Sequence, residues 1–140
     1  MKPIYKRLLL KLSGEVLAGE KGVGIDFEKV LEVCESIKEC VDMGVQVAIV
    51  VGGGNFWRGR SSGKMDRTRA DHMGMLATTM NAIALSDAFI RNGMDTVVMS
   101  AVEMDTYADH YTARHADRLL KEGKICIFAG GTGSPYFSTD

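Results

Sequence analysis

Four short apolar segments recur along the chain, and each is followed within a few residues by a glycine or another small residue. They are residues 6–11 (KRLLLK), 45–51 (VQVAIVV), 95–100 (DTVVMS) and 125–129 (ICIFA). Apolar runs of this length, bounded by glycine, are typical of buried strands in a parallel sheet. The pattern therefore predicts four strands.

Apolar positions at helical spacing separate these strands. A helix is predicted across residues 30–41, with Asp26 suited to cap its start and Gly44 placed to end it. A long helix is predicted over residues 70–91, and a further one lies within 107–122. Because strands and helices alternate, we expect a three-layer α/β/α fold with a mainly parallel central sheet. The strand order is not determined by the pattern.

The long helix carries a stripe of small and apolar side chains. The stripe consists of Met73, Leu76, Ala77, Met80, Ala84 and Ala88. Two explanations fit it equally well: burial beneath the sheet, or contact with a second copy of the chain.

Two segments lack periodicity and are predicted to be loops. Residues 15–24 contain Gly19, Gly22 and Gly24, which favours a mobile loop. Residues 59–69 (GRSSGKMDRTR) are polar and basic, which favours a surface loop.

The composition is that of an ordinary soluble globular domain. Of the 140 residues, 46% are hydrophobic and 25% charged, and the formal net charge is −1. This balance gives no electrostatic footprint for nucleic acid or for an anionic membrane. Neither a membrane-spanning apolar run nor a secretory leader is recognised, so we expect a cytoplasmic protein. Cys34, Cys40 and Cys126 lack metal-ligand spacing and are expected to be free thiols.

The strongest chemical signal follows the second strand. Gly52, Gly53 and Gly54 precede Asn55, and Arg58 comes four residues after the last glycine. Glycines let the backbone approach a ligand closely, and the amides of such a loop together with an arginine favour an anion. The loop matches neither the Walker motif nor the dinucleotide fingerprint. A phosphate group is the predicted ligand, and a tight turn is the alternative.

Two further loops of small residues follow predicted strands. Lys11 precedes Ser13 and Gly14, and residues 130–140 (GGTGSPYFSTD) follow the last strand. Because parallel strands end at one edge of a sheet, we expect all three loops to meet there. Asp71, near the start of the long helix, is placed either to interact with the helix dipole or to accept hydrogen bonds from a ligand.

No metal site is predicted. His110 and His115 are five residues apart, which places them on different faces of a helix. Asp109 and Asp117 do not complete a ligand set with them.

These motifs together resemble the bacterial uridylate kinase (UMP kinase) family of the amino acid kinase superfamily. The matching segments are KLSGE at 11–15, GGGN at 52–55 with Arg58, DHMGMLAT at 71–78 and GTGSPYFSTD at 131–140. GGGN is also found in aspartate, glutamate and carbamate kinases, whereas the last two segments are specific to the uridylate branch. Ser138 replaces a commoner threonine, and Ser134 stands where asparagine is frequent.

The resemblance implies a kinase that transfers a phosphoryl group from Mg-ATP to UMP, in a cytoplasmic homohexamer. Its implied catalytic residues are Lys11, Arg58 and Asp140, the last orienting Lys11. The implied ATP-binding residues are Lys11, Leu12, Ser13, Gly14, Gly54 and Arg58. The implied UMP-binding residues are Gly53, Asp71, Thr132, Gly133, Ser134, Pro135, Tyr136, Phe137, Ser138 and Thr139. A loop tied to activation by GTP corresponds to Gly19, Glu20, Lys21, Gly22, Val23 and Gly24.

The family's chain continues beyond the point that matches Asp140. We therefore expect residues 1–140 to be the N-terminal, nucleoside monophosphate-binding portion of an amino acid kinase-like domain, poorly active without the C-terminal part. The alternatives are a non-catalytic UMP-binding or oligomerisation module and another phosphotransferase of the superfamily.

Overall fold

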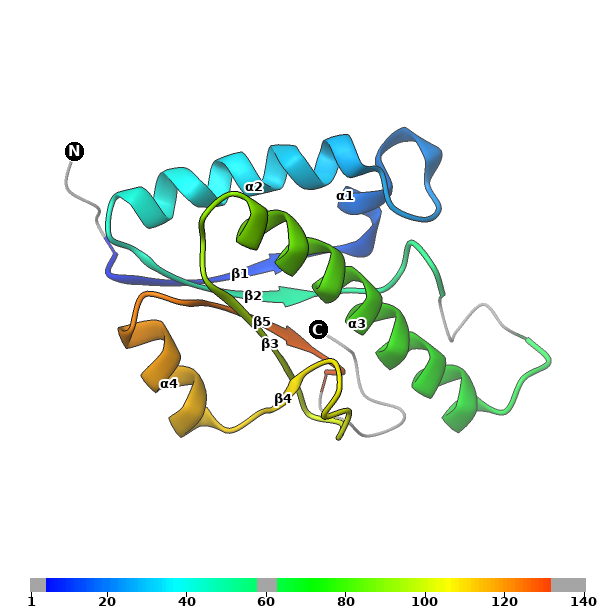
Figure 1. The fold of residues 1–140 in the computed structure, drawn as a ribbon. Coiled ribbons are helices and arrows are strands. Elements are labelled where there is room, and N and C mark those ends of the chain that lie inside the picture. The colour runs from blue at the N-terminus through cyan, green and yellow to red at the C-terminus, as the bar shows by residue number, and fades with distance from the viewer. Residues whose placement is uncertain (1–4, 58–62, 132–140) are drawn as a thin grey trace.

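A parallel sheet forms the centre of the molecule. The computed structural model describes residues 5–57 and 63–131, and within them the sheet has five strands in the order β1-β2-β5-β3-β4 (Figure 1). The strands are β1 (Arg7–Leu12), β2 (Gln46–Val51), β3 (Thr96–Ser100), β4 (Asp109–His110) and β5 (Ile125–Ala129). Each neighbouring pair is parallel. The four predicted strands are confirmed to within one residue at each end, whereas the two-residue β4 is too short to leave a hydrophobic pattern.

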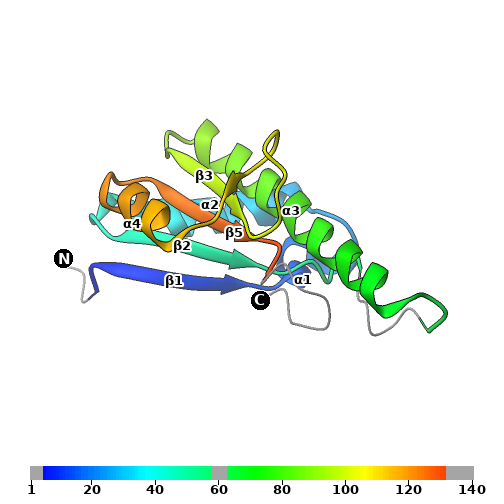
Figure 2. The same cartoon turned by 90° about the horizontal axis from the view of Figure 1, so that it is seen from below.

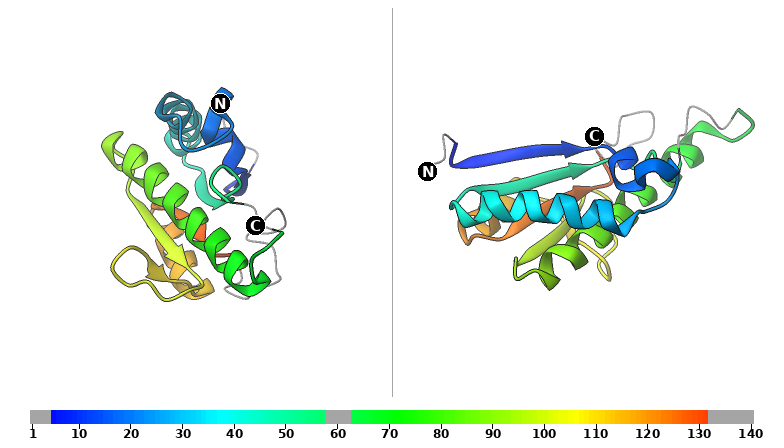
Figure 3. Two further views of the ribbon diagram at one scale, coloured as in Figure 1. Left: turned by 90° about the vertical axis from the view of Figure 1, so that its right-hand side faces the viewer. Right: turned by 90° about the horizontal axis from the view of Figure 1, so that it is seen from above.

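Helices cover both faces of this sheet, as predicted. They are α1 (Gly14–Ala18), the 3-10 turn η1 (Gly19–Lys21), α2 (Phe27–Asp42), α3 (Arg67–Arg91) and α4 (Ala113–Lys121). The helices α2 and α3 lie on one face, and α4 lies on the other across β2 and β5 (Figures 2 and 3). The α/β/α fold expected from the sequence is therefore confirmed.

Each face of the sheet has its own apolar core. The larger core joins α1, α2 and α3 to the sheet and includes Leu17, Ile37, Ile49, Leu85 and Phe89. The smaller core lies under α4 and consists of Ala48, Met99, Ala116, Leu119, Leu120 and Cys126. Burial of these side chains is the main force that holds the three layers together.

The segment predicted to be a mobile loop at residues 15–24 is instead partly helical. Here α1 and η1 follow β1 directly, and Gly19 and Gly22 adopt positive φ angles of 61° and 71° at the ends of these turns. The loop prediction was wrong because Leu17 and Ala18 are fully buried in the larger core. A five-residue helix is too short to show helical periodicity, so the glycines led to the prediction of a loop.

The predicted capping of α2 is confirmed, and α3 begins earlier than predicted. Asp26 accepts a hydrogen bond from the Glu28 amide at 3.0 Å. Asp66 caps α3 in the same way, accepting from the Arg69 amide at 3.1 Å. Residues 67–69 are therefore helical and do not belong to the surface loop predicted for 59–69.

The predicted stripe on α3 is divided between two faces. Ala77 and Ala88 are buried and Ala84 is half-buried, whereas Met73, Leu76 and Met80 are exposed. The face turned toward the sheet carries Met75, Thr78, Ala82, Leu85 and Phe89. Because α3 is apolar on nearly all sides, periodicity alone did not separate the buried face from the exposed one.

Length and composition would also allow α3 to cross a membrane, and it is the one such helix in the described part of the chain. Half of its apolar window, however, is buried inside the protein. A core helix of a globular protein has the same properties, and the packing of α3 on β3 and β5 identifies it as one.

The three cysteines are free thiols, as predicted. Cys34 and Cys126 are buried and Cys40 is partly so. Burial raises the pKa of the Cys126 thiol to about 11, because the thiolate would lose its hydration. These side chains act as small apolar groups in the core.

Candidate active site

The strands β1, β2 and β5 end at one edge of the sheet, and the segments that follow them start there. These three strands are neighbours, with Leu12 opposite Val51 and Val50 opposite Phe128. Their arrowheads point to the same side in Figure 1. The Gly52 amide donates to the Leu12 carbonyl at 2.8 Å, so the first two loops are joined where they leave the sheet. The carboxyl edge of a parallel sheet is where ligands bind in open α/β folds.

The first two loops touch at Gly14. A β-carbon on Gly14 would lie 2.8 Å from the Gly54 nitrogen and 2.9 Å from the Asn55 nitrogen. Both atoms belong to the main chain, so neither can move aside without moving the loop. Glycine is therefore required at this position, and the contact leaves the backbone of both loops on one surface. Lys11 is exposed at the end of β1 beside them.

The helix α3 contacts both the second loop and the end of β5. A β-carbon on Gly53 would lie 2.8 Å from the Ala77 β-carbon, 3.0 Å from the Thr78 nitrogen and 3.1 Å from the Gly74 carbonyl oxygen. The hydroxyl of Thr78 accepts a hydrogen bond from the Gly130 amide at 2.8 Å, at the end of β5. One helical turn thus contacts both Gly53 and Gly130.

A pair of asparagines lies beneath the second loop. The Asn81 amide nitrogen donates to the Gly52 carbonyl and to the Asn55 side-chain oxygen, both at 2.7 Å. In return, the Asn55 amide nitrogen donates to the Asn81 side-chain oxygen at 3.0 Å. Asn81 was not predicted as a site residue, although a lone amide within a long apolar helix is a signal that could have identified it.

Asp71 lies one turn inside α3, because the helix begins earlier than predicted. Both of its carboxylate oxygens accept from the Arg67 side-chain Nε at 3.1 Å. Its side chain is only 12% exposed. This ion pair fixes the direction of the carboxylate more firmly than the helix dipole would.

Acidic side chains near α4 are paired with basic side chains or with a histidine. Asp117 lies 2.9 Å from both Arg7 and Lys121, whose hydrogen bonds, Lys121 first, hold the pKa of its carboxyl below the usual value. Asp109 lies 3.0 Å from His115. Within residues 5–57 and 63–131, no group of three or more His, Cys, Asp or Glu side chains is arranged to hold a metal ion.

The sequence of the chain matches a known protein family. Residues 6–140 match the amino acid kinase family. The chain belongs to the amino acid kinase family. The family and the α/β fold expected from the motifs are therefore both confirmed.

Solved structures resemble this amino acid kinase chain closely. UMP kinase from Ureaplasma parvum superposes with a TM-score of 0.89 at 36% identity, over 96% of this chain and 60% of that one. UMP kinase from Bacillus anthracis gives 0.90 at 35% identity, over 96% and 57%. An isopentenyl phosphate kinase substrate complex gives 0.59 at 15% identity, over 89% and 54%, and this shows the shared fold alone. The chain thus spans somewhat under two thirds of the two UMP kinases.

Several predicted site residues of this amino acid kinase lie outside the described residues. They are Arg58, Thr132, Gly133, Ser134, Pro135, Tyr136, Phe137, Ser138, Thr139 and Asp140. The structure brings together the others at the carboxyl edge: Lys11, Leu12, Ser13, Gly14, Gly53 and Gly54. Asp71 lies on the same helix as the Ala77 and Thr78 contacts of Gly53.

The segment implied in GTP activation is bonded to the second loop. The Gly24 amide donates to the Asn55 carbonyl at 2.9 Å, and the Asn55 side chain donates to the Gly24 carbonyl at 2.7 Å. Glu20, Lys21 and Val23 are exposed. The turn is therefore open to solvent at its tip and anchored to the glycine loop at its base.

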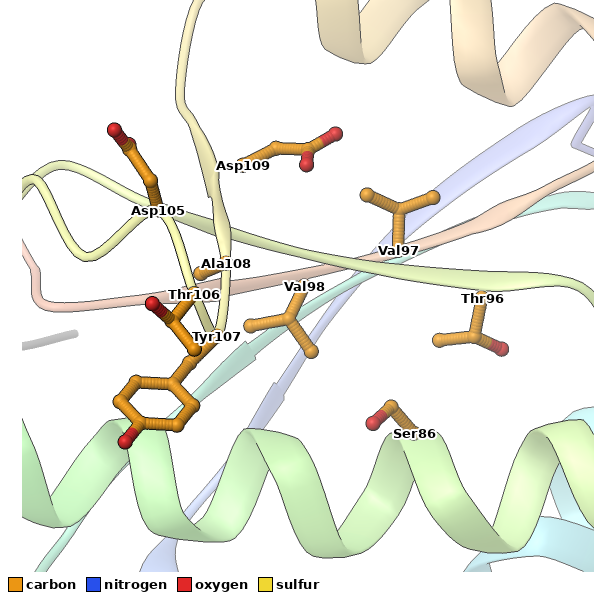
Figure 4. A pocket seen from close by; sticks show the side chains of 9 residues that line it. All are labelled: Ser86, Thr96, Val97, Val98, Asp105, Thr106, Tyr107, Ala108 and Asp109. Atoms are coloured by element: carbon orange, nitrogen blue, oxygen red, sulfur yellow. The ribbon is translucent and has the colours of Figure 1, made fainter.

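A hollow of about 330 Å³ lies elsewhere, between α3, the outer side of β3 and the segment before β4 (Figure 4). Its lining residues are Ser86, Thr96, Val97, Val98, Asp105, Thr106, Tyr107, Ala108 and Asp109. The β3 residues that line the hollow belong to the start of that strand, whereas the glycine loops follow the ends of their strands. No predicted site residue lines it.

Proposed function

We propose that the protein transfers a phosphoryl group from Mg-ATP to UMP, giving UDP and ADP, as a step of pyrimidine nucleotide biosynthesis. The observation that carries the proposal is the contact of two small-residue loops at the sheet edge where β5 also ends, with Gly14 packed on Gly54 and Asn55. Membership of the amino acid kinase family and the likeness to two UMP kinases support it. The family match favours an enzyme over a non-catalytic binding module.

Phosphoryl transfer requires two phosphate groups held in line and their charge neutralised, with little covalent assistance from the protein. We assign Lys11, Leu12, Ser13 and Gly14 to the ATP phosphates, together with Gly54 and Arg58. Lys11 is the cation nearest the transferred group, and Asp140 orients it. Magnesium arrives as part of the ATP substrate and neutralises phosphate charge.

The acceptor side is assigned to Gly53, Asp71 and residues 132–139. Asp71 accepts from a ribose hydroxyl, because its carboxylate is fixed by Arg67 and partly open to solvent. Residues 132–139 (TGSPYFST) supply hydroxyls and aromatic rings for the uracil and its phosphate. We propose that Gly19–Gly24 carries the GTP response, that the native assembly is a homohexamer and that the protein is cytoplasmic.

The test is a coupled assay of the native protein with Mg-ATP and UMP, CMP or dUMP as acceptor. UMP is expected to be the best acceptor, and Asp71→Asn is expected to raise the KM for UMP about ten- to hundredfold. This follows because an unmatched buried polar partner costs about 1–3 kcal/mol. The KM for ATP is expected to change little.

Asp87→Asn is the matched control. Asp87 pairs with Arg91 four residues away on the same helix, as Asp71 pairs with Arg67, but near the other end of α3. It is expected to leave both KM values unchanged. Equal effects of Asp71→Asn on UMP and ATP would contradict the ribose assignment, and CMP turnover equal to that of UMP would contradict the acceptor assignment.

The exposed face of α3 is proposed to contact a second copy of the chain. Met73, Leu76, Met80, Ile83 and Ile90 are all exposed and recur at helical spacing along one face. A row of exposed apolar side chains of this kind marks an interaction surface. A helix face that meets its own copy across a two-fold axis buries the stripe on both chains at once.

Leu76→Glu is therefore expected to lower the molar mass of the native assembly measured by light scattering at micromolar concentration. Leu31→Glu is the control, because Leu31 on α2 is 50% exposed and Leu76 is 56% exposed. The Leu31→Glu protein is expected to keep the wild-type mass. A wild-type monomer, or an unchanged mass for Leu76→Glu, would contradict the proposed contact.

A further inference from the structure

Asn81 is a fully buried amide in the middle of α3, surrounded by apolar residues of the larger core. Burying an amide costs free energy unless each of its hydrogen-bonding groups finds a partner. Asn81 meets this requirement through Gly52 and Asn55. None of these three hydrogen bonds joins the Asn81 side chain to α3 itself, so the amide serves the loop after β2 and not its own helix.

The orientation of both amides follows from their other partners. The Gly52 and Gly24 carbonyl oxygens can only accept, so Asn81 and Asn55 must each turn their nitrogen toward them. With these positions fixed, each asparagine has one N–H left, and each directs it at the oxygen of the other. Rotating either side chain by half a turn would break three hydrogen bonds. The pair therefore specifies one conformation.

We propose that Asn81 is a positioning residue for phosphoryl transfer: through Gly52 and Asn55 it sets the main chain of residues 52–55. This inference rests on the proposed function. Asn81 has no exposed surface and touches no substrate, so it acts only through the loop. Gly14 packs on this same loop. The Asn81 amide therefore also affects the position of the loop after β1.

A run of three glycines needs such a support more than other loops do. Glycine has the largest conformational freedom of all residues, so residues 52–54 would sample many backbone conformations if they were held only at their ends. Catalytic groups that neutralise charge work best when they are already in place before the reaction. Asn81 provides this support without occupying any space at the surface.

The test compares Asn81→Asp with Thr79→Val in the native protein. Aspartate keeps the shape and the acceptor of asparagine but turns oxygen atoms toward the Gly52 carbonyl and the Asn55 side-chain oxygen. Thr79 is a buried polar residue two positions away whose hydroxyl donates to the Met75 carbonyl and to the Met104 sulfur, and neither of these hydrogen bonds is to the loop. Both variants lose a buried hydrogen bond, but only the first loses the support of the loop.

Asn81→Asp is expected to lower kcat by about tenfold or more with a smaller change in the KM for UMP, because misplaced catalytic groups weaken the transition state most. Hydrogen–deuterium exchange of the peptide covering residues 46–57 is expected to accelerate by about tenfold, since local opening becomes easier. Thr79→Val is expected to change neither quantity. If Asn81→Asp does not fold, Asn81→Ser, which keeps a hydroxyl donor, carries the same prediction with a smaller loss.

A double-mutant cycle separates positioning from general destabilisation. Asn55→Ala combined with Asn81→Ala is expected to lower kcat no further than the worse single variant, because the two residues act through one contact. Losses that multiply would overturn the proposal. Unchanged exchange in Asn81→Asp, or accelerated exchange with unchanged kcat, would also overturn it. A wild-type protein that does not phosphorylate UMP would contradict the proposed function, and the exchange experiment would then decide separately whether Asn81 holds the loop.

Discussion

Replacing Lys11 by alanine in the native protein is expected to lower kcat by about a hundredfold to a thousandfold, while UMP still binds. The physical reason is that the ammonium group neutralises charge that grows on the transferring phosphoryl group, so its interaction is strongest in the transition state. Lys11 stands at the end of β1, next to the contact between Gly14 and the second loop. The measurement is steady-state turnover, with UMP binding followed separately by calorimetry.

Two further variants make this experiment decisive. Lys11→Arg keeps the positive charge with a different shape, and it is expected to recover part of the lost turnover. Lys38→Ala removes a lysine near the end of α2, where Lys38 pairs with Asp42. This end of the helix leads into the start of β2, whereas the loops follow the strand ends, so the variant is expected to leave kcat unchanged. A loss of UMP affinity that accounts for the whole effect of Lys11→Ala would remove Lys11 from the phosphoryl-transfer step.

Local signals explain which parts of the fold the sequence predicted. The strands ending at Val51 and Ala129 are apolar runs closed by glycine, and Asp26 caps its helix with its own side chain. Each of these features is encoded within a few neighbouring residues. Strand order, by contrast, depends on which strands pair: β5 lies between β2 and β3 although it comes last in the sequence. Nothing local to β5 contains that information.

The same distinction applies to the candidate site. The three loops were predicted individually, and the parallel topology brings the ends of the strands before them to one edge. What holds them there was not predicted. Asn81 meets Asn55 across 26 positions in the sequence, and Thr78 meets Gly130 across 52. Such contacts appear only when the helix is placed on the sheet, and α3 has apolar residues on nearly all sides, so its sequence did not show which side faces the sheet.

Gly53→Ala tests the placement of α3 most directly, and it is expected to lower both stability and turnover. The added β-carbon would lie 2.8 Å from the Ala77 β-carbon and 3.0 Å from the Thr78 nitrogen. Because the second atom belongs to the main chain of a helix, the loop must move and no side chain can give way. Overpacking of this kind costs about 1–3 kcal/mol of unfolding free energy, which urea denaturation measures.

Gly74→Ala is the matched control, since Gly74 lies on the turn of α3 that faces Gly53. A β-carbon there would meet nothing closer than the Trp57 ring at 4.0 Å. Alanine is a better helix former than glycine by about 1 kcal/mol, so this variant is expected to be as stable as the wild type or more so. The two substitutions add the same methyl group to neighbouring positions, and only the first forces the second glycine loop away from the helix. If Gly53→Ala keeps wild-type stability and turnover, the loop tolerates a displacement from α3, and the close contact is not what positions it for phosphoryl transfer.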